Sequence, residues 1–274
     1  MIHTVIIFGA NGMLGRYMTS YFSKKTEYKV IPIKRNDFDI TEKTILLLDS
    51  FLESYHMDEH TCVINCIGFI PQKEKVQSNS NYYTINSIFP QYLSKVCNKY
   101  KSKLICPTTD CVFNGKKGNY IETDFADETN MYGISKSLGE PADATVIRVS
   151  IIGEERNNPC SFLEFVKNSK GIINGWDNHM WNGITCFQYC KVVDQIIQSN
   201  LFWKGVRHLY SPDRRSKYEL ACIIKEVYHL PCEINQYHAP IIVDKTLSSI
   251  YDTSLLFSIP SLEIQIKEQS TFTI

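Results

Sequence analysis

The chain has 274 residues, of which 43% are hydrophobic, so it can form one large domain or one domain with a smaller lobe. Lysine plus arginine and aspartate plus glutamate both number 29, and this zero formal charge argues against binding of nucleic acid or membrane surfaces through net charge. There is no run of 18 apolar residues and no signal-peptide pattern, so we expect a soluble, cytoplasmic protein without a membrane span.

Short apolar runs alternate with longer amphipathic segments over the first 150 residues. The runs predict strands over residues 4–8, 29–33, 62–66, 103–107 and 145–148, and the clearest helix is predicted over residues 83–100. Strands that alternate with helices predict an α/β fold with a Rossmann-type, doubly wound parallel sheet. We therefore expect a dinucleotide-binding domain over residues 1–150.

The pattern changes after Arg148. Residues 162–166, 192–197 and 220–227 are predicted helices, and residues 205–210 are a predicted strand. We interpret residues 151–274 as a smaller substrate-binding lobe that closes over the end of the sheet, with some of the chain crossing back to the sheet.

A glycine-rich turn follows the first predicted strand and opens a helix. Gly9 turns the chain, Gly12 lets the backbone approach a pyrophosphate, and Gly15 lets the helix pack on the strand. The helix N-terminus then faces the phosphates. The alternative is a tight turn without a ligand. The cofactor contacts expected here are Gly9, Asn11, Gly12, Met13, Leu14 and Gly15.

The end of the second predicted strand indicates which cofactor binds. A basic residue there suits the 2′-phosphate of NADPH, and an acidic one suits the free 2′-hydroxyl of NADH. The strand ends in Lys34 and Arg35, so we expect NADPH; the alternative is that both are solvated surface charges. The other expected cofactor contacts are Asp39 and Ile40 near the adenine, and Cys66, Ile67 and Gly68 where the cofactor crosses the sheet.

Tyr132 and Lys136 stand four residues apart on a predicted helix, and Thr109 follows the fourth strand. Thr109 could bond a substrate oxygen. Lys136 would lower the pKa of Tyr132 and hold the nicotinamide ribose, and Tyr132 would protonate the alkoxide that forms on hydride transfer. The alternative for Tyr132 is a core aromatic residue. Tyr21 and Lys25 share the spacing, and a chance match is expected among 16 tyrosines. The context of the glycine turn favours Tyr132.

These stretches resemble a known family. Residues 9–15, residues 108–115 (Thr-Thr-Asp-Cys-Val-Phe-Asn-Gly) and residues 132–140 (Tyr-Gly-Ile-Ser-Lys-Ser-Leu-Gly-Glu) look like the extended short-chain dehydrogenase/reductases, and most like the dTDP-4-dehydrorhamnose reductase family. The resemblance runs from residue 3 to about residue 150 and more loosely to the end. It implies a catalytic trio of Thr109, Tyr132 and Lys136. It also implies an NADPH-dependent reduction of a nucleotide-activated 4-keto-6-deoxyhexose in deoxysugar biosynthesis.

Three departures from the family pattern bear on the substrate. Lys34 and Arg35 replace an acidic strand end, and Cys111 stands where these reductases usually carry Tyr. Residues 178–183 (Asn-His-Met-Trp-Asn-Gly) resemble relatives that act on UDP-2-acetamido-2,6-dideoxy-hexuloses. We therefore expect a UDP- or dTDP-linked sugar, with the departures favouring a UDP-linked, N-acetylated sugar of the rhamnosamine type.

Cys111 is a candidate second catalytic group. It resembles in position the Cys of bifunctional epimerase/reductases, which moves a proton at a carbon beside the ketone. Those enzymes also use a Lys or His partner, whose place falls on Phe165; Lys167 and His179 are nearby options. A 3- or 5-epimerase activity is thus one interpretation of Cys111, and a residue that lines the sugar pocket is the other.

The remaining candidates lie around the expected substrate. The contacts that we expect are Thr109, Asp110, Cys111, Val112, Trp181 and Asn182, although a tryptophan in a lobe can serve only for packing. Arg207, Arg214 and Arg215 are candidates for the nucleotide diphosphate or are solvated, and Arg148 is expected to be structural.

Ten cysteines without a Cys-x-x-Cys pair indicate reduced thiols and no metal site. Cys186 and Cys190 are expected to be packing residues.

Two alternative functions stay open. The first is another nucleotide-sugar epimerase or 4,6-dehydratase of the same fold, although a dehydratase would need an acidic residue where Cys111 follows Asp110. The second is a non-catalytic, nucleotide-binding regulatory subunit, like the one of methionine adenosyltransferase that this branch also resembles. A homodimer is also left open.

Overall fold

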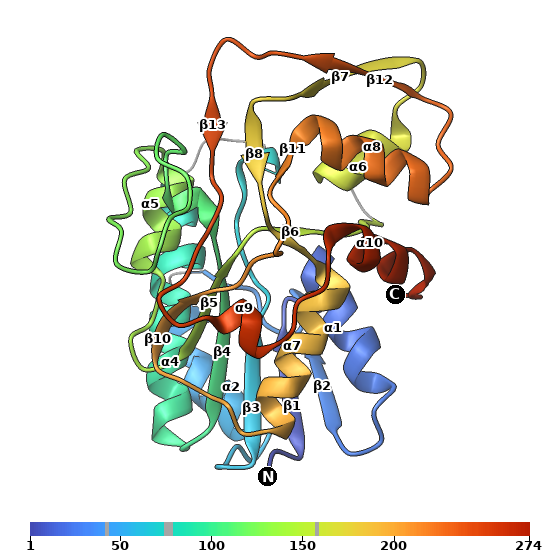
Figure 1. Cartoon of the computed structure of the whole chain (residues 1–274). Helices are drawn as coiled ribbons and strands as arrows, with labels where there is room; N and C mark the ends of the chain where they lie inside the picture. The colour runs from blue at the N-terminus through green and yellow to red at the C-terminus, as the bar shows by residue number, and fades with distance from the viewer. Residues whose placement is uncertain (42–43, 74–78, 157–158) are drawn as a thin grey trace.

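A parallel sheet forms the centre of the computed structural model, which describes residues 1–41, 44–73, 79–156 and 159–274 (Figure 1). Its strands lie in the order β2–β1–β3–β4–β5–β10. Their bounds are β1 Thr4–Phe8, β2 Lys29–Ile33, β3 Thr61–Asn65, β4 Lys103–Thr109, β5 Thr145–Val149 and β10 Gly205–His208. The predicted strands are confirmed, with shifts of one or two residues at their ends.

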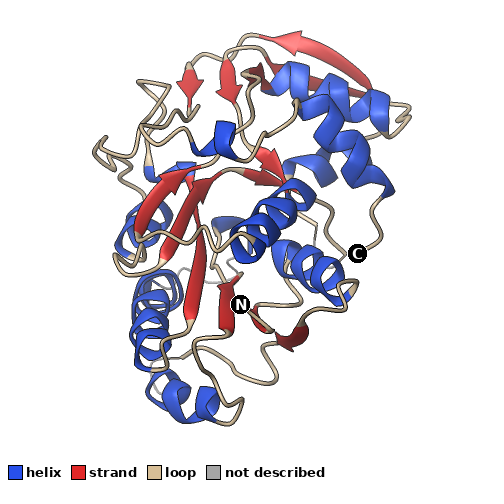
Figure 2. Cartoon of the chain, turned by 60° about the horizontal axis from the view of Figure 1, so that its bottom comes forward, coloured by secondary structure: helices blue, strands red, loops and turns tan. Residues whose placement is uncertain are grey.

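The inner strands β1 and β3 are almost fully buried because both faces of the sheet are covered. Ile7 packs on one face with helices α1 (Met13–Ser23) and α7 (Cys186–Gln198), and Ile6 and Phe8 pack on the other face with α4 (Phe89–Lys99). Figure 2 shows helices on both sides of the sheet. The predicted Rossmann-type fold is therefore confirmed.

The chain reverses its direction across the sheet between β1 and β3. β2 pairs with one side of β1 and β3 with the other, both in parallel. Loops that leave neighbouring strands in opposite directions open a crevice at the carboxyl ends of those strands, where ligands bind in such sheets. This end of the sheet faces the lobe at the top of Figure 1.

The helix predicted over residues 83–100 consists of two parts. The first, η3 (Tyr82–Ile88), is a π-helix, and the regular helix α4 follows from Phe89. Short π-helical segments widen a helix and often occur near functional sites. Here the wider turn lies beside α5 (Met131–Leu138).

The lobe lies over the carboxyl ends of the strands (Figure 1). It has its own apolar cluster around Leu163, Leu220 and Ile224. Its elements are α6 Phe162–Asn168, β7 Ile172–Trp176, β8 His179–Trp181, β11 Arg215–Ser216, α8 Lys217–Val227, β12 Glu233–Tyr237, β13 Val243–Asp244 and α10 Leu262–Thr271.

Two elements of the C-terminal half return to the sheet. β10 pairs with β5, with Gly205 beside Thr145, and α7 packs against α1. A division of the chain between residues 150 and 151 stays a prediction, since the sheet is completed by residues from beyond it.

The remaining short elements are η1 Thr44–Leu47, α2 Leu48–Glu53, η2 Pro71–Lys73, α3 Asn79–Asn81, η4 Asp110–Val112, β6 Ile151–Ile152, β9 Ile184–Thr185 and α9 Thr253–Leu256. Among the described residues, the structure contains no helix with the length and apolar character that a membrane span requires.

Candidate active site

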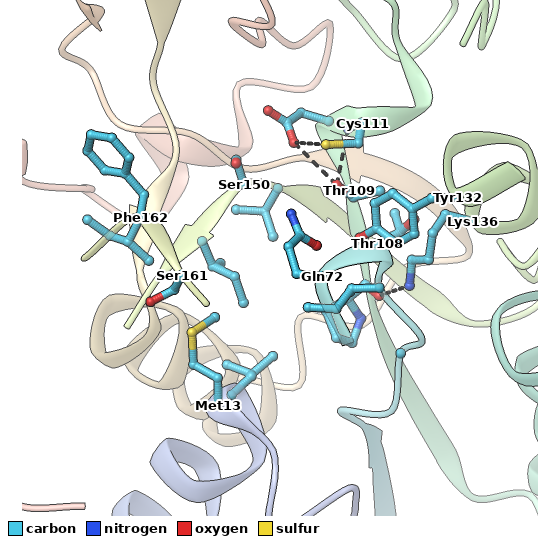
Figure 3. Close-up of a pocket in the computed structure, with 18 of the residues that line it drawn as sticks. Met13, Gln72, Thr108, Thr109, Cys111, Tyr132, Lys136, Ser150, Ser161 and Phe162 are labelled. Atoms are coloured by element: carbon cyan, nitrogen blue, oxygen red, sulfur yellow. Dashed lines mark hydrogen bonds between the residues drawn. The ribbon is translucent and has the colours of Figure 1, made fainter. Parts of the chain in front are cut away.

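A cavity of about 560 Å³ lies between the sheet and the lobe, at the carboxyl ends of β1, β3, β4 and β5. Side chains from both sides of the crevice point into it (Figure 3). The predicted site residues that line it are Gly12, Met13, Leu14, Cys66, Ile67, Gly68, Thr109, Asp110, Cys111, Tyr132, Lys136 and Trp181. The structure thus joins the predicted cofactor end and the predicted chemical end in one cavity.

The glycine turn is shaped by close backbone contacts. Gly9 has φ +74°, and a Cβ built on it would lie 2.9 Å from the carbonyl oxygen of Cys66. A Cβ on Gly15 would overlap the carbonyl oxygen of Gly9, so α1 starts directly on the turn. Larger residues at either position would push the helix away from β1 and β3.

The N-terminus of α1 suits a phosphate group. Gly12 is its N-cap residue in an extended conformation, and no side chain of the described residues caps the helix there. The first N–H groups of a helix have no partner within the helix and attract anions. Because Gly12, Met13 and Leu14 line the cavity, this end fits the pyrophosphate of a dinucleotide.

The other predicted cofactor residues lie outside the lining of the cavity. Lys34, Arg35 and Asp39 are exposed, and the Arg35 guanidinium lies 3.4 Å from the Asp39 carboxylate. Ile40 belongs to the apolar core, and Asn11 is exposed. Contacts of these residues with a cofactor stay predictions.

Thr109, Tyr132 and Lys136 lie on one wall of the cavity (Figure 3). Thr109 ends β4, where its hydroxyl accepts the Cys111 N–H at 3.1 Å and donates to the Asp110 carboxylate at 3.2 Å. The Lys136 ammonium donates to the carbonyl oxygen of Pro107 at 3.4 Å. The three predicted catalytic side chains are thus brought together by β4 and α5.

Helix α5 is fixed on the sheet side by small residues and by Asn86. The Asn86 amide donates to the Ser135 hydroxyl at 3.1 Å and to the Phe69 carbonyl oxygen at 2.9 Å. A Cβ on Gly139 would overlap the Asn86 carbonyl oxygen. The loop after β3 and the helix that carries Tyr132 are therefore held by the same residue of the π-helical turn.

Burial changes the pKa of both members of the pair. Burial raises the pKa of Tyr132, and the nearby Cys111 raises it further. The Thr109 side chain acts in the opposite direction. Burial lowers the pKa of Lys136, against the effect of Cys106 and Glu140. The predicted lowering of the Tyr132 pKa by Lys136 is therefore not found. Burial outweighs it, and the ammonium is directed at a backbone carbonyl.

Cys111 lines the cavity, but its thiol is held in the protonated form. Burial and the adjacent Asp110 raise its pKa to about 12, while Lys245 opposes the shift. Three described positions were considered for the acid/base partner of Cys111, and none of them lines the cavity. Phe165 is exposed, Lys167 pairs with Glu154 at 3.0 Å, and His179 packs on Trp176.

Tyr21 of α1 and Lys25, which lies two residues beyond the end of α1, form the second Tyr-x-x-x-Lys pair and have a structural role. The Tyr21 hydroxyl donates to the Asp194 carboxylate at 3.1 Å, and the Lys25 ammonium lies 2.9 Å from the same group. Asp194 belongs to α7, so this pair ties α1 to α7.

The family comparison agrees with this geometry. A model of the family described as "RmlD substrate binding domain" matches residues 3–241. The chain belongs to this family.

Relatives within the RmlD family are named as reductases. The dTDP-4-dehydrorhamnose reductase of Aggregatibacter actinomycetemcomitans is 26% identical over 80% of this chain and 77% of its own. The crystal structure of the dTDP-4-dehydrorhamnose reductase of Bacillus anthracis in complex with NADP superimposes with a TM-score of 0.82, at 20% identity and full coverage of both chains. The predicted family is therefore confirmed, and the predicted class of enzyme agrees with these names.

A relative with a different name also matches. Methionine adenosyltransferase 2 subunit beta of Rattus norvegicus is 23% identical over 83% of this chain and 72% of its own. The alternative of a non-catalytic, nucleotide-binding regulatory subunit therefore stays open.

The substrate end of this RmlD-family cavity differs from the sequence prediction. Trp181 lines it, but the Asn182 side chain bonds the backbone of Leu247, and Val112 is buried in an apolar cluster. The three candidate arginines have other contacts: Arg207 packs on Trp203 and Tyr251, Arg214 pairs with Asp244, and Arg215 with Asp213.

Lys217 and Lys245 line the cavity instead, and sequence reasoning missed both. The only sequence signal for Lys217 is its place after Ser216, whose hydroxyl accepts the Glu219 N–H at 3.1 Å in a capping box. That motif marks a helix start but does not say what the helix faces.

Proposed function

We propose that this protein is an NADPH-dependent 4-reductase of a nucleotide-activated 4-keto-6-deoxyhexose. The observation that supports this most is that Thr109, Tyr132 and Lys136 share one cavity with the uncapped N-terminus of α1. The names of the family relatives support the same reaction and the same cofactor.

In this proposal the residues of the cavity wall orient the ketone and deliver a proton. NADPH, when bound, supplies the hydride that goes to C4 of the sugar. Thr109 holds the C4 oxygen, and Tyr132 donates its phenolic proton to that oxygen as negative charge develops on it. Lys136 lies one turn further along α5 and stabilises this charge and the cofactor ribose. The raised pKa of Tyr132 keeps its proton in place until the alkoxide forms.

The nucleotide of the substrate is the finer part of the proposal. Several of the relatives are named for dTDP-linked sugars. The prediction of a UDP-linked, N-acetylated sugar rests on residues 178–183. Asn178 bonds the Ala239 backbone and Asn182 the Leu247 backbone, so only Trp181 of this stretch lines the cavity. This geometry favours a dTDP-linked sugar as the first substrate to test.

The test is the oxidation of NADPH by the purified protein with four substrates. These are the dTDP- and UDP-linked 4-keto-6-deoxyhexoses, each with and without a 2-acetamido group. We expect loss of NADPH absorbance and a product reduced at C4 with at least one of them. A protein that binds NADPH but reduces none of the four would contradict the proposal and favour the alternative of a non-catalytic, nucleotide-binding subunit, with which the match to methionine adenosyltransferase 2 subunit beta is compatible.

A further inference from the structure

Lys217 is a partly buried cation that lines the cavity. It is the first residue of α8, and its ammonium lies 5.0 Å from the ring centroid of Trp181 and 4.7 Å from that of Phe162. The two rings come from β8 and from the start of α6. All three residues line the cavity that also holds Tyr132.

Lys245, which also lines the cavity, and the two candidate arginines outside its lining are paired with carboxylates. Lys245 lies 3.3 Å from Glu128, Arg214 lies 2.6 Å from Asp244, and Arg215 lies 3.3 Å from Asp213. For Lys217, no hydrogen bond or ion pair is found among the described residues, and its contacts are the faces of the two rings. Lys217 thus lines the cavity without a direct salt bridge, although the Asp110 carboxylate is near enough to favour its charged form.

An arrangement of this kind is expected where a ligand supplies the anion. A charge removed from water is costly unless it is paired, and aromatic faces offset only part of that cost. Burial lowers the pKa of Lys217, with Asp110 and Cys111 opposing the shift. A bound anion would hold the ammonium in its charged form.

We propose that Lys217 binds the diphosphate of the nucleotide sugar, with Trp181 and Phe162 fixing the position of its ammonium. This inference rests on the proposed function. The diphosphate is attached to C1 of the sugar, on the side of the ring away from C4. A substrate whose C4 oxygen meets Tyr132 therefore extends toward another wall of the cavity. Lys217 lines this cavity without a hydrogen bond or ion pair among the described residues, and lysine is a common phosphate ligand.

The experiment measures the binding of dTDP, UDP and thymidine by calorimetry, without NADPH and without a keto sugar. The variants are Lys217→Met, which keeps the length of the side chain and removes its charge, and Lys217→Arg, which keeps a charge. Lys267→Met, an exposed lysine of α10 paired with Glu263, is the control. The thermal midpoint of each variant shows whether it is folded.

We expect Lys217→Met to weaken binding of the better nucleoside diphosphate by at least about tenfold, as for the loss of a charged hydrogen bond. Binding of thymidine should stay unchanged, and Lys217→Arg should retain most of the diphosphate affinity. If the reductase is active, the loss should raise KM more than it lowers kcat.

Unchanged diphosphate affinity in folded Lys217→Met would overturn the inference, as would an equal loss for thymidine, which would indicate a role in packing. Failure of the wild-type protein to bind either diphosphate would do the same. If diphosphate binding depends on Lys217 but no keto sugar is reduced, the inference stands and the proposed reductase function fails.

Discussion

Tyr132 and Tyr21 have the same spacing to a lysine but different surroundings. Tyr132 lines the cavity beside Thr109, whereas Tyr21 bonds Asp194 between two helices. The spacing places Tyr132 and Lys136 on one face of α5, whereas α1 ends at Ser23 before Lys25, and spacing alone does not say what either pair meets. The pair that faces a cavity can do chemistry, and the pair that faces another helix stabilises the packing.

We predict that Tyr132→Phe lowers the rate of reduction by a factor of about 10²–10⁴, the usual contribution of a positioned general acid. The affinity for NADPH should change little, because the hydroxyl acts when the alkoxide forms. Single-turnover loss of NADPH absorbance measures the rate, and a fluorescence titration measures the affinity. Tyr21→Phe is the matched control and should reduce at the wild-type rate. A Tyr132→Phe protein as fast as wild type would refute the assignment.

The structure favours the interpretation that Cys111 lines the sugar pocket over the interpretation that it acts as an epimerising base. A thiol whose pKa is raised to about 12 is almost fully protonated near neutral pH and cannot accept a proton from carbon. We predict that the wild-type protein, with substrate and NADP⁺ in heavy water, incorporates no deuterium into the sugar ring beyond the spontaneous background. Mass spectrometry of the recovered sugar provides the measurement.

Cys111→Ser should accordingly keep its reductase activity within about threefold, since a hydroxyl replaces a neutral thiol of similar shape. Deuterium at C3 or C5 that appears with the wild-type protein and disappears in Cys111→Ser would establish the epimerase activity instead.

At the scale of an element, the end of β2 is where the cofactor preference is expected. Lys34 and Arg35 follow the last residue of β2, are exposed, and could each contact a 2′-phosphate. We predict that the double change to Ser weakens NADPH binding by about tenfold or more, as expected for charged hydrogen bonds, and leaves NADH binding unchanged. Lys29→Ser, an exposed lysine at the opposite end of the same strand, is the control. Equal affinities of the unmodified protein for the two cofactors would show that the charges are only solvated.

The sequence predicts well those helices and strands whose apolar residues follow a single periodicity. Strands such as β1 are continuous apolar runs between turns, and the glycine turn and the Tyr-x-x-x-Lys pair lie next to recognisable elements. The π-helical turn at Asn86 was not predicted, because the apolar spacing of residues 83–100 fits one regular helix. Lys217 was missed because its surroundings combine α6, β8 and α8, which only the tertiary structure brings together. The raised pKa of Cys111 depends on burial, which a motif does not reveal.

At the scale of the whole molecule, a buried polar network joins the sheet to the C-terminal half. Arg148 of β5 donates to the imidazole of His208 in β10 at 2.9 Å, and it pairs with Glu140 at 2.6 Å. The other ring nitrogen of His208 lies 2.8 Å from the carbonyl oxygen of Ser248. The expected structural role of Arg148 is therefore confirmed. His208 must be neutral to accept from the guanidinium.

This network predicts a loss of stability at mildly acidic pH. Burial and Arg148 lower the pKa of His208 from 6.5 to about 4 in the folded protein. A base whose pKa is lowered by folding stabilises the protein above its unfolded pKa, and this contribution is lost as the pH falls from 6.5 toward 4. We predict that the free energy of unfolding decreases by about 2 kcal/mol between pH 7 and pH 5, from this residue alone.

Urea denaturation at both pH values checks the prediction, with His208→Gln expected to remove most of this difference. His229→Gln, at an exposed histidine after α8, should behave as wild type. The lower limit of pH 5 leaves Glu122 ionised. Burial would raise its pKa, but the Ser249 hydroxyl and the His208 and Ile250 N–H groups lower it overall. An identical pH dependence of wild type and His208→Gln would contradict the argument.

The place of β10 and α7 affects how the protein folds during synthesis. When residues 1–150 have left the ribosome, the outer edge of β5 has no neighbour, and Tyr17, Met18 and Phe22 of α1 are without the α7 residues that cover them. The helix face can be covered once α7 has emerged, at residue 198, and the strand edge is paired only after residue 208 has emerged. At about 5–20 residues per second, the nascent chain exposes the strand edge for roughly 3–12 s and the helix face for slightly less. During that interval the unpaired strand edge and the uncovered helix face of residues 1–150 are open to aggregation.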